Sequence, residues 1–147
     1  MLAVVLFLAW HVVAPLIFGY QAAVPNAKPK TVDLNNPKQI LAEADRYAWV
    51  FNSQEAGRLY ARAEQLFIKS GDEADEIHAR VGLIRARAET RSFVDISQSL
   101  ATELKKPVVQ RNPRLKLWVL GAKGYTDIEI NPSAAKAEWR EARSSMP

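Results

Sequence analysis

The fold is decided by residues 53–70, which read SQEAGRLYARAEQLFIKS. Apolar side chains recur in this stretch at spacings of three and four residues, which places them on one face of an α-helix. They are Ala56, Leu59, Tyr60, Ala63, Leu66 and Phe67. Ser70-Gly71-Asp72 follows, and glycine supplies the left-handed cap that ends many helices. The stretch therefore predicts an amphipathic helix that buries one face and ends at residue 70.

Five further helices are predicted around this stretch by the same periodicity and by helix-terminating residues. Three of them span residues 38–51, 73–90 and 92–105. The other two begin at Asn112-Pro113 and at Asn131-Pro132. Proline favours these two starts, because the first helical position needs no backbone donor. Pro107 ends the fourth helix, since the residue before a proline avoids helical geometry. The domain is therefore predicted to be all-α, with six helices in three consecutive helix-turn-helix pairs.

The three pairs repeat along the chain with a period of about 39 residues, within the range of helical-repeat arrays. The second helices carry equivalent marker triplets at Ala56-Tyr60-Ala63, Ile96-Leu100-Glu103 and Ala135-Trp139-Ala142. The first helices carry Gly82 and Gly121, which are separated by the same period. These glycines are the only identical pair when residues 79–104 are aligned with residues 118–143. The hydrophobic pattern repeats, whereas the residue identities do not.

This arrangement resembles the tetratricopeptide repeat family, whose units place Leu-Gly in the first helix and a small-x3-aromatic-x2-Ala run in the second. The best matches are Leu120-Gly121, Ala56-Tyr60-Ala63 and Ala135-Trp139-Ala142, with Pro107 near the expected exit of the middle unit. The resemblance covers about residues 38–143. The chain departs from the family in its period, which is longer than the family's, and at Glu103, where a small residue is expected. The resemblance implies an α-solenoid of three stacked hairpins.

The resemblance also implies a function, because the family binds partner segments in the groove lined by its first helices. Carried over by register, the partner-binding positions are Glu76, Arg87, Leu115, Trp118 and Tyr125. Trp118 and Tyr125 are large and semi-polar, like the residues that anchor protein interfaces. Trp118 fits either the groove or the core, whereas Trp49 and Trp139 are predicted in the core. The implied function is a protein–protein interaction or scaffold module that needs no cofactor.

The first charged residue of the chain is Lys28, and the whole segment before it carries no charged side chain. Met1 to Phe18 reads MLAVVLFLAWHVVAPLIF, and about 18 helical residues span about 27 Å, close to the hydrocarbon thickness of a bilayer. We expect residues 1–19 to form an apolar helix that is a cleaved signal or an uncleaved anchor, followed by a Pro-rich linker at 20–37 and the repeat domain at 38–147. A buried helix of a soluble fold is the remaining alternative. The first two place the protein at the membrane or outside the cytoplasm, in the cell envelope or periplasm.

The sequence gives little basis for catalysis. The chain has no cysteine, which excludes disulfides and thiolate chemistry. His78 is the only histidine beyond the leader, and four acids lie just before it in sequence: Asp72, Glu73, Asp75 and Glu76. A metal site needs three or four converging ligands, and no histidine pair supplies them. We therefore predict that the chain is not an enzyme, with a metal-dependent domain around His78 as a less favoured alternative.

Charge is unevenly distributed along the chain, whose net charge is +4. Residues 28–70 sum to +2, residues 71–104 to −3 and residues 105–147 to +5. The last region holds Lys105, Lys106, Arg111, Arg114, Lys116 and Lys123 with no acid between them. Binding of an anionic lipid or nucleic-acid surface through residues 105–123 is therefore the second alternative, although six scattered charges make nucleic acid the weaker choice.

Two further expectations concern exposed surfaces. Five charged residues share one line of the third helix and are predicted to face solvent: Glu73, Glu76, Arg80, Arg87 and Arg91. Within this line Glu76 and Arg80 have the order of a stabilising i,i+4 pair. The array ends at residues 144–147 without a clearly polar cap, so a homo-oligomer through the C-terminal end is a further partner hypothesis.

Overall fold

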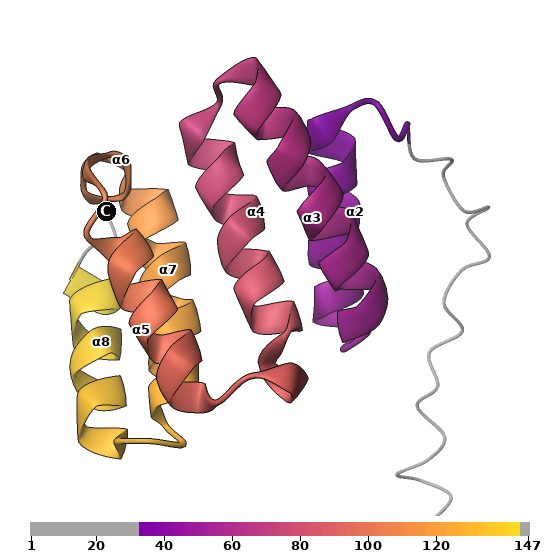
Figure 1. Cartoon of the computed structure of the whole chain (residues 1–147). Coiled ribbons are helices and arrows are strands. Elements are labelled where there is room, and N and C mark those ends of the chain that lie inside the picture. Colours follow the sequence, from indigo (N-terminus) through magenta and orange to yellow (C-terminus); the bar gives the residue numbers. More distant parts are fainter. Residues whose placement is uncertain (1–32, 145–147) are drawn as a thin grey trace, which may run out of the picture. The chain divides into compact units, whose positions relative to one another are not determined.

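The computed structural model describes residues 33–144. These residues form seven α-helices and one short 3-10 helix, with no strand among them (Figure 1). The elements are α2 (Pro37–Trp49), α3 (Ser53–Ser70), α4 (Glu73–Ala86), η1 (Ala88–Thr90), α5 (Phe93–Leu104), α6 (Pro107–Arg111), α7 (Pro113–Asp127) and α8 (Pro132–Ser144). The prediction of an all-α domain is confirmed for this part of the chain. The apolar helix expected at residues 1–19 and most of the linker expected at residues 20–37 lie outside the described residues.

Side-chain caps fix the starts of the six longer helices. Asn36, Asn52 and Asp72 accept backbone N–H groups at the starts of α2, α3 and α4. Ser92, Asn112 and Asn131 do the same for α5, α7 and α8. Such a cap is worth about 1 kcal/mol, so the boundaries are encoded locally. At the other end of α3, Gly71 adopts φ 74° as the C-cap, which confirms that prediction.

Two short helical elements depart from the prediction. η1 replaces the last turn of the helix predicted over residues 73–90, and α4 ends at Ala86. α6 begins at Pro107, which was expected only to end the preceding helix. The second departure follows from a simple rule, since proline forbids a continuing helix but fits the first position of a new one.

The end of α2 differs from the prediction in its position and in the exposure of Trp49. The helix was expected to reach Phe51, but it ends at Trp49, and Phe51 adopts φ 58° as the chain turns toward α3. Trp49 is 83% exposed, so the prediction that it lies in the core is wrong, and Phe51, just beyond the helix end, is 90% exposed. Trp139, also predicted in the core, is 47% exposed.

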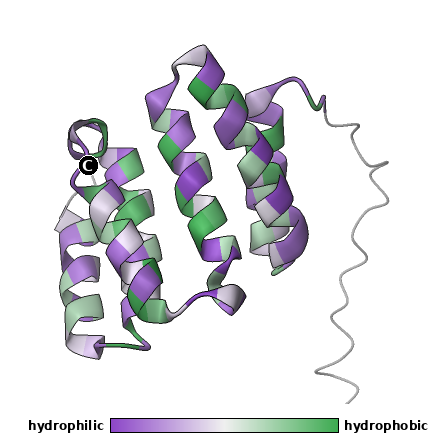
Figure 2. Ribbon diagram, viewed as in Figure 1, coloured by the Kyte–Doolittle hydropathy of each residue, from purple (hydrophilic) through white to green (hydrophobic). Residues whose placement is uncertain are grey.

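The helices bury two apolar clusters. The first joins α2, α3 and the facing side of α4, around Tyr60 and Phe67. The second joins α4, α5, α6 and α7, around Ile77, Leu100 and Val119. Apolar and hydrophilic residues alternate along the helices in Figure 2, as expected for helices that bury one side.

The three predicted pairs differ in how closely they pack. α3 packs closely on both α2 and α4, and α8 packs on α7. α5 packs mainly on α7 and only lightly on α4, so the middle pair is open (Figure 1). None of the helices in residues 33–144 is long and apolar enough to cross a membrane.

Candidate partner-binding surface

Helix α4 has two polar faces of different composition. His78 and Arg85 lie about 20° apart at 100° per residue, and both contact Trp118 of α7. Arg80 lies about 160° from His78 around the helix axis and contacts carboxylates of α3 and α5. The helix therefore separates an aromatic surface, shared with the other first helices, from a charged cavity shared with the second helices.

Trp118 is the centre of the aromatic surface. Its ring stacks on the His78 imidazole, with centroids 4.7 Å apart and an interplanar angle of 24°. The indole N–H donates a hydrogen bond to the backbone carbonyl of His78 at 3.4 Å. The Arg85 guanidinium lies 5.3 Å from the Trp118 ring centroid, where a cation is attracted to the π-system. Three contacts thus hold a tryptophan side chain that remains partly exposed.

Asp45 extends this surface to α2. Its Oδ1 accepts a hydrogen bond from the Tyr60 hydroxyl at 2.7 Å and lies 3.2 Å from His78 Nε2. Burial raises the pKa of Tyr60 far above its usual range, and the hydrogen bond to Asp45 adds to this effect. Asp45, His78 and Trp118 therefore connect the three first helices, α2, α4 and α7, along one surface.

The surroundings of the Asp45–His78 pair are a tyrosine hydroxyl and the Trp118 ring. A carboxylate can orient an imidazole for nucleophilic catalysis, but a nucleophile must stand beside it. The adjacent hydroxyl belongs to Tyr60, whose raised pKa opposes formation of the tyrosinate. In the described part of the chain, no group of three or more His, Cys, Asp or Glu side chains could hold a metal ion. In this geometry the pair orients His78 beneath Trp118.

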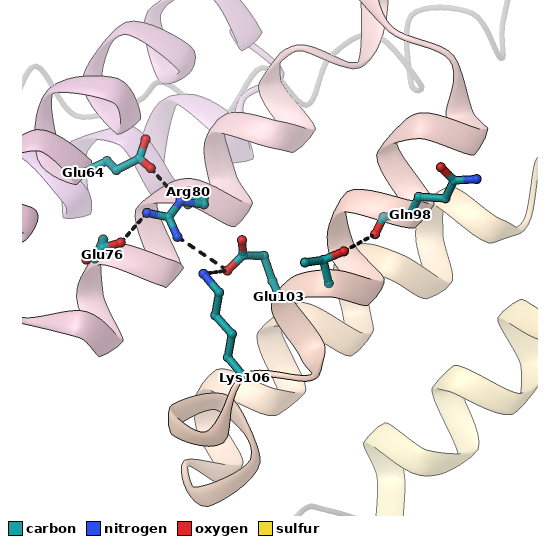
Figure 3. Close-up of polar contacts among 7 residues, drawn as sticks. Glu64, Glu76, Arg80, Gln98, Glu103 and Lys106 are labelled. Carbon is teal, nitrogen blue, oxygen red and sulfur yellow. Dashed lines mark hydrogen bonds and ion pairs between the residues drawn. The ribbon is translucent and has the colours of Figure 1, made fainter.

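On its other side, α4 borders a cavity of about 430 Å³. Its walls come from α3, α4 and α5 and the adjoining turn: Glu64, Arg80, Leu83, Ile84, Arg87, Arg91, Ser99, Thr102 and Glu103. Arg80 lies 2.7 Å from Glu64 and 3.7 Å from Glu103, and it also pairs with Glu76 (Figure 3). Lys106 supplies a second cation, 2.7 Å from the Glu103 carboxylate. A network of three carboxylates and two cations therefore joins the open middle pair.

This network explains an irregularity of the sequence. Glu103 stands where the tetratricopeptide pattern expects a small residue, and it is only 7% exposed. Burial opposes the charge on Arg80, but hydrogen bonds to Glu64 and Glu76 outweigh it and raise the pKa of Arg80. The Glu76–Arg80 pair is confirmed, but Arg80 is partly buried rather than fully solvated. At position 103 the chain thus has a glutamate that pairs with Arg80 and Lys106, in place of the small residue that would allow close helix packing.

The structure divides the five sequence-predicted positions among three environments. Trp118 and Tyr125 lie on α7, where Tyr125 is 64% exposed. Leu115 is 5% exposed and packs in the core. Glu76 belongs to the Arg80 network, and Arg87 lines the cavity. The alignment with the tetratricopeptide pattern placed all five residues in one groove. The repeat pattern in the sequence does not specify which side of α4 faces α7.

Sequence reasoning missed Asp45 and Arg85 and considered His78 only as a possible metal ligand. Gly121 was named there as a marker of the repeat. Gly121 is exposed, and within the described chain a Cβ at this position would meet nothing within 4 Å. The helix surface between Trp118 and Tyr125 is therefore bare backbone. The spacing of 118, 121 and 125, which places all three on one side of α7, was the available signal.

The basic segment at residues 105–123 is partly neutralised by the fold. Lys106 pairs with Glu103, Lys116 lies 2.8 Å from Glu141, and Lys123 contacts Asp127 and Glu138 at 2.6 and 2.7 Å. Burial opposes the charge on Lys123, but these two carboxylates outweigh it and raise the pKa of Lys123. Of the six cations, Lys105, Arg111 and Arg114 are the exposed ones. This segment therefore offers an anionic surface less charge than its sequence suggests.

Comparisons with protein-family models, curated proteins and solved structures find no match to this chain. The described residues define an all-α helical domain. Its likeness to the tetratricopeptide repeat family stays a prediction based on the residues quoted above.

Proposed function

We propose that this domain is a protein-interaction module of tetratricopeptide-like architecture, which binds a partner segment along the surface of α2, α4 and α7. One observation carries the proposal: Trp118 is partly exposed yet held by His78 and Arg85, and it neighbours the exposed Tyr125 across Gly121. An aromatic side chain that is already fixed loses little conformational entropy when a partner covers it. Tryptophan, tyrosine and arginine are also the residues that most often dominate binding energy.

The surface indicates the chemistry of the segment it would bind. Bare backbone at Gly121 leaves room for an apolar side chain between the Trp118 and Tyr125 rings. Arg85 is exposed beside Trp118 and would pair with a carboxylate of the partner. We therefore propose a peptide segment with an apolar or aromatic anchor followed or preceded by an acidic residue.

The proposal includes a location but no self-association. Residues 1–19, which lie outside the described part of the chain, are proposed to tether or export the module, so that the partner is met at the membrane or in the cell envelope. A homo-oligomer through the C-terminal end is not included, because the exposed side of α8 is mostly polar or small. Its exposed residues include Ser133, Lys136, Ala137, Arg140 and Arg143, with Trp139 as the large exception.

Affinity capture with the full chain tests this proposal. Trp118→Ala removes the anchor, and Gly121→Gln fills the bare site, where an added Cβ meets no described atom. Lys136→Gln on the exposed side of α8 is the matched control. We expect one set of partners to be lost in the first two variants and retained in the control, with all three circular dichroism spectra unchanged. Equal capture by all variants would refute the proposed surface.

A further inference from the structure

The exposed large apolar residues gather at one end of the helices. Of the eleven such residues in the described part of the chain, seven lie in or beside the connections that lead from α2 to α3, α4 to α5 and α7 to α8. They are Trp49, Val50, Phe51, Phe93, Val94, Ile128 and Ile130, exposed by 38–90%. The three connections lie at the same end of the helices (Figure 1). We call this set of seven residues the apolar end.

The opposite end of the helices has a different composition. Its connections, from α3 to α4 and from α5 through α6 to α7, carry charged residues: Lys69, Asp72, Glu73, Lys105, Lys106 and Arg111. Only Leu34 and Ile68 of the exposed apolar set lie toward that end. A monomer fully surrounded by water has no reason to segregate its exposed apolar residues in this way, so the asymmetry marks a contact surface.

Phe51 strengthens this interpretation. A bulky residue at φ 58° is uncommon, because the left-handed conformation costs about 1–2 kcal/mol when the residue has a Cβ. Backbone hydrogen bonds from the N–H groups of Phe51 and Asn52 to the carbonyls of Ala48 and Tyr47 hold this turn at the end of α2, but the Phe51 side chain is 90% exposed and gains nothing from packing. Glycine or asparagine would fit this backbone better. The choice of a phenylalanine at this exposed turn is therefore not explained by packing within the described residues, which is consistent with an external contact.

We propose that the apolar end contacts the interfacial region of a lipid bilayer, with the helices standing on the membrane by their ends. The seven side chains project from three separate turns, and a fluid interface accommodates such projections without a matching surface. Tryptophan and other aromatic residues are enriched at this depth of the membrane. This contact is separate from the Trp118 surface, which lies on the sides of α4 and α7 and stays in water.

The charges beside the apolar end distinguish this contact from binding to anionic lipid. Arg46, Arg87 and Arg91 lie near the turns, but Glu89, Asp95 and Glu129 lie there as well. Attraction therefore comes from apolar burial rather than from headgroup charge, and a zwitterionic bilayer suffices. The exposed cations Lys105, Arg111 and Arg114 lie toward the other end of the domain.

The chain outside the described residues allows this orientation. The apolar stretch at residues 1–18 is expected to bring the protein to a membrane, and the 14 residues from 19 to 32 have a maximum reach of about 46 Å at 3.3 Å per residue. α2 is about 20 Å long at 1.5 Å per residue. The connection is therefore long enough for the end of the domain far from Pro37 to turn toward the same bilayer.

Site-specific labelling tests the orientation, because the chain has no native cysteine. Single cysteines at Gln54, Glu89 and Glu129 place an environment-sensitive fluorophore beside each apolar turn, and Lys69→Cys labels the opposite end; all four positions are exposed. With the full chain on phosphatidylcholine vesicles, we expect nitroxide-labelled lipid to quench the first three labels several-fold more than the label at position 69. Raising the salt concentration should not abolish the difference.

A paired set of variants separates this contact from insertion of the leader. Trp49→Ser combined with Phe51→Asn removes two apolar side chains, and asparagine tolerates the left-handed backbone at position 51. We expect this change to remove the preferential quenching at Gln54, whereas Ile68→Ser at the opposite end leaves it intact. Equal quenching at all four positions would show that only the leader holds the protein, and would overturn the proposal. A Gln54 label that responds to an added protein but not to vesicles would overturn it too.

Discussion

A glycine of a first helix lies against an aromatic ring of a second helix at two places in this fold. Gly82 of α4 faces Tyr60 of α3, and Gly124 of α7 faces Trp139 of α8; at each glycine an added Cβ would overlap the ring. The two rings differ in freedom, because Tyr60 is 1% exposed and Trp139 is 47% exposed. A glycine packed against an aromatic ring therefore brings α3 and α4 together at a buried contact, and α7 and α8 together at a contact that is half exposed.

The comparison also shows that sequence register and packing register differ. Gly82 contacts the ring of the preceding pair, whereas Gly124 contacts the ring of its own pair. Gly121, which occupies the repeat position equivalent to Gly82, packs on neither ring. The repeat offset found in the sequence thus aligns Gly82 with Gly121, although their surroundings differ. The glycine of α7 that does pack against a ring is Gly124, about one helical turn after Gly121.

The largest effect is expected from Gly82→Ala. The added methyl group would overlap a ring that is buried and tied by its hydroxyl to Asp45, so neither the ring nor α4 can move without breaking other contacts. We expect a loss of about 3 kcal/mol in the free energy of unfolding, at the upper end for overpacked sites. Chemical denaturation monitored by circular dichroism measures it. If Gly82→Ala lowered the free energy of unfolding by less than Gly124→Ala, the conclusion that Tyr60 is less free to move than Trp139 would be contradicted.

A smaller loss is expected from Gly124→Ala. Here the methyl group meets the Trp139 indole, whose exposed side leaves room for the ring to rotate outward. The higher helix propensity of alanine offsets part of the cost, so we expect a net loss of about 1.5 kcal/mol. The double variant Gly124→Ala with Trp139→Ala should recover most of the contribution from steric overlap. If the second substitution gave no relief, the ring would not be the obstacle.

Tyr60→Phe isolates the hydrogen bond that holds the buried ring. It removes the donor to Asp45 but keeps the packing against Gly82, and we expect a loss of about 1 kcal/mol at neutral pH. The free energy of unfolding should also depend on pH through Tyr60, because burial raises the pKa of Tyr60 in the folded state above its usual 10.0. Above pH about 10 the unfolded chain releases a proton that the folded chain retains. This contribution of Tyr60 to stability then falls by about 1.4 kcal/mol per pH unit.

The gap between the unfolding free energies of parent and Tyr60→Phe should therefore close as the pH rises above about 10. Denaturation of both proteins at pH 7 and at two alkaline values measures this. A gap that stays constant would mean that the Tyr60 hydroxyl ionises as readily in the folded protein as in the unfolded chain.

The helices were predictable because their signals are local. Capping residues such as Asn112, the cap glycine Gly71 and the apolar period of residues 53–70 act over a few residues, and they fixed most boundaries. The end of α2 was missed because Phe51 continues the apolar period, and no local rule anticipates a phenylalanine in the left-handed region.

The candidate site was less predictable, since it depends on contacts between distant segments. Trp118 and Tyr125 could be proposed from residue type, but Asp45 and Arg85 acquire a role only through their contacts with His78 and Trp118. Glu103 shows the same limit: its sequence position suggested an irregular repeat, and only the approach of Arg80 explains its burial.

The smallest effect, and the only gain, is expected from Gly121→Ala. Gly121 is helical and exposed, and a Cβ there meets no described atom within 4 Å, so alanine should stabilise α7 by about 0.5–1 kcal/mol. The result would sharpen the contrast with Gly82, because two glycines at equivalent repeat positions would respond with opposite signs. Thermal denaturation of both alanine variants measures this. A loss of stability at Gly121 would mean that something packs there after all, and that the repeat offset marks a shared packing site.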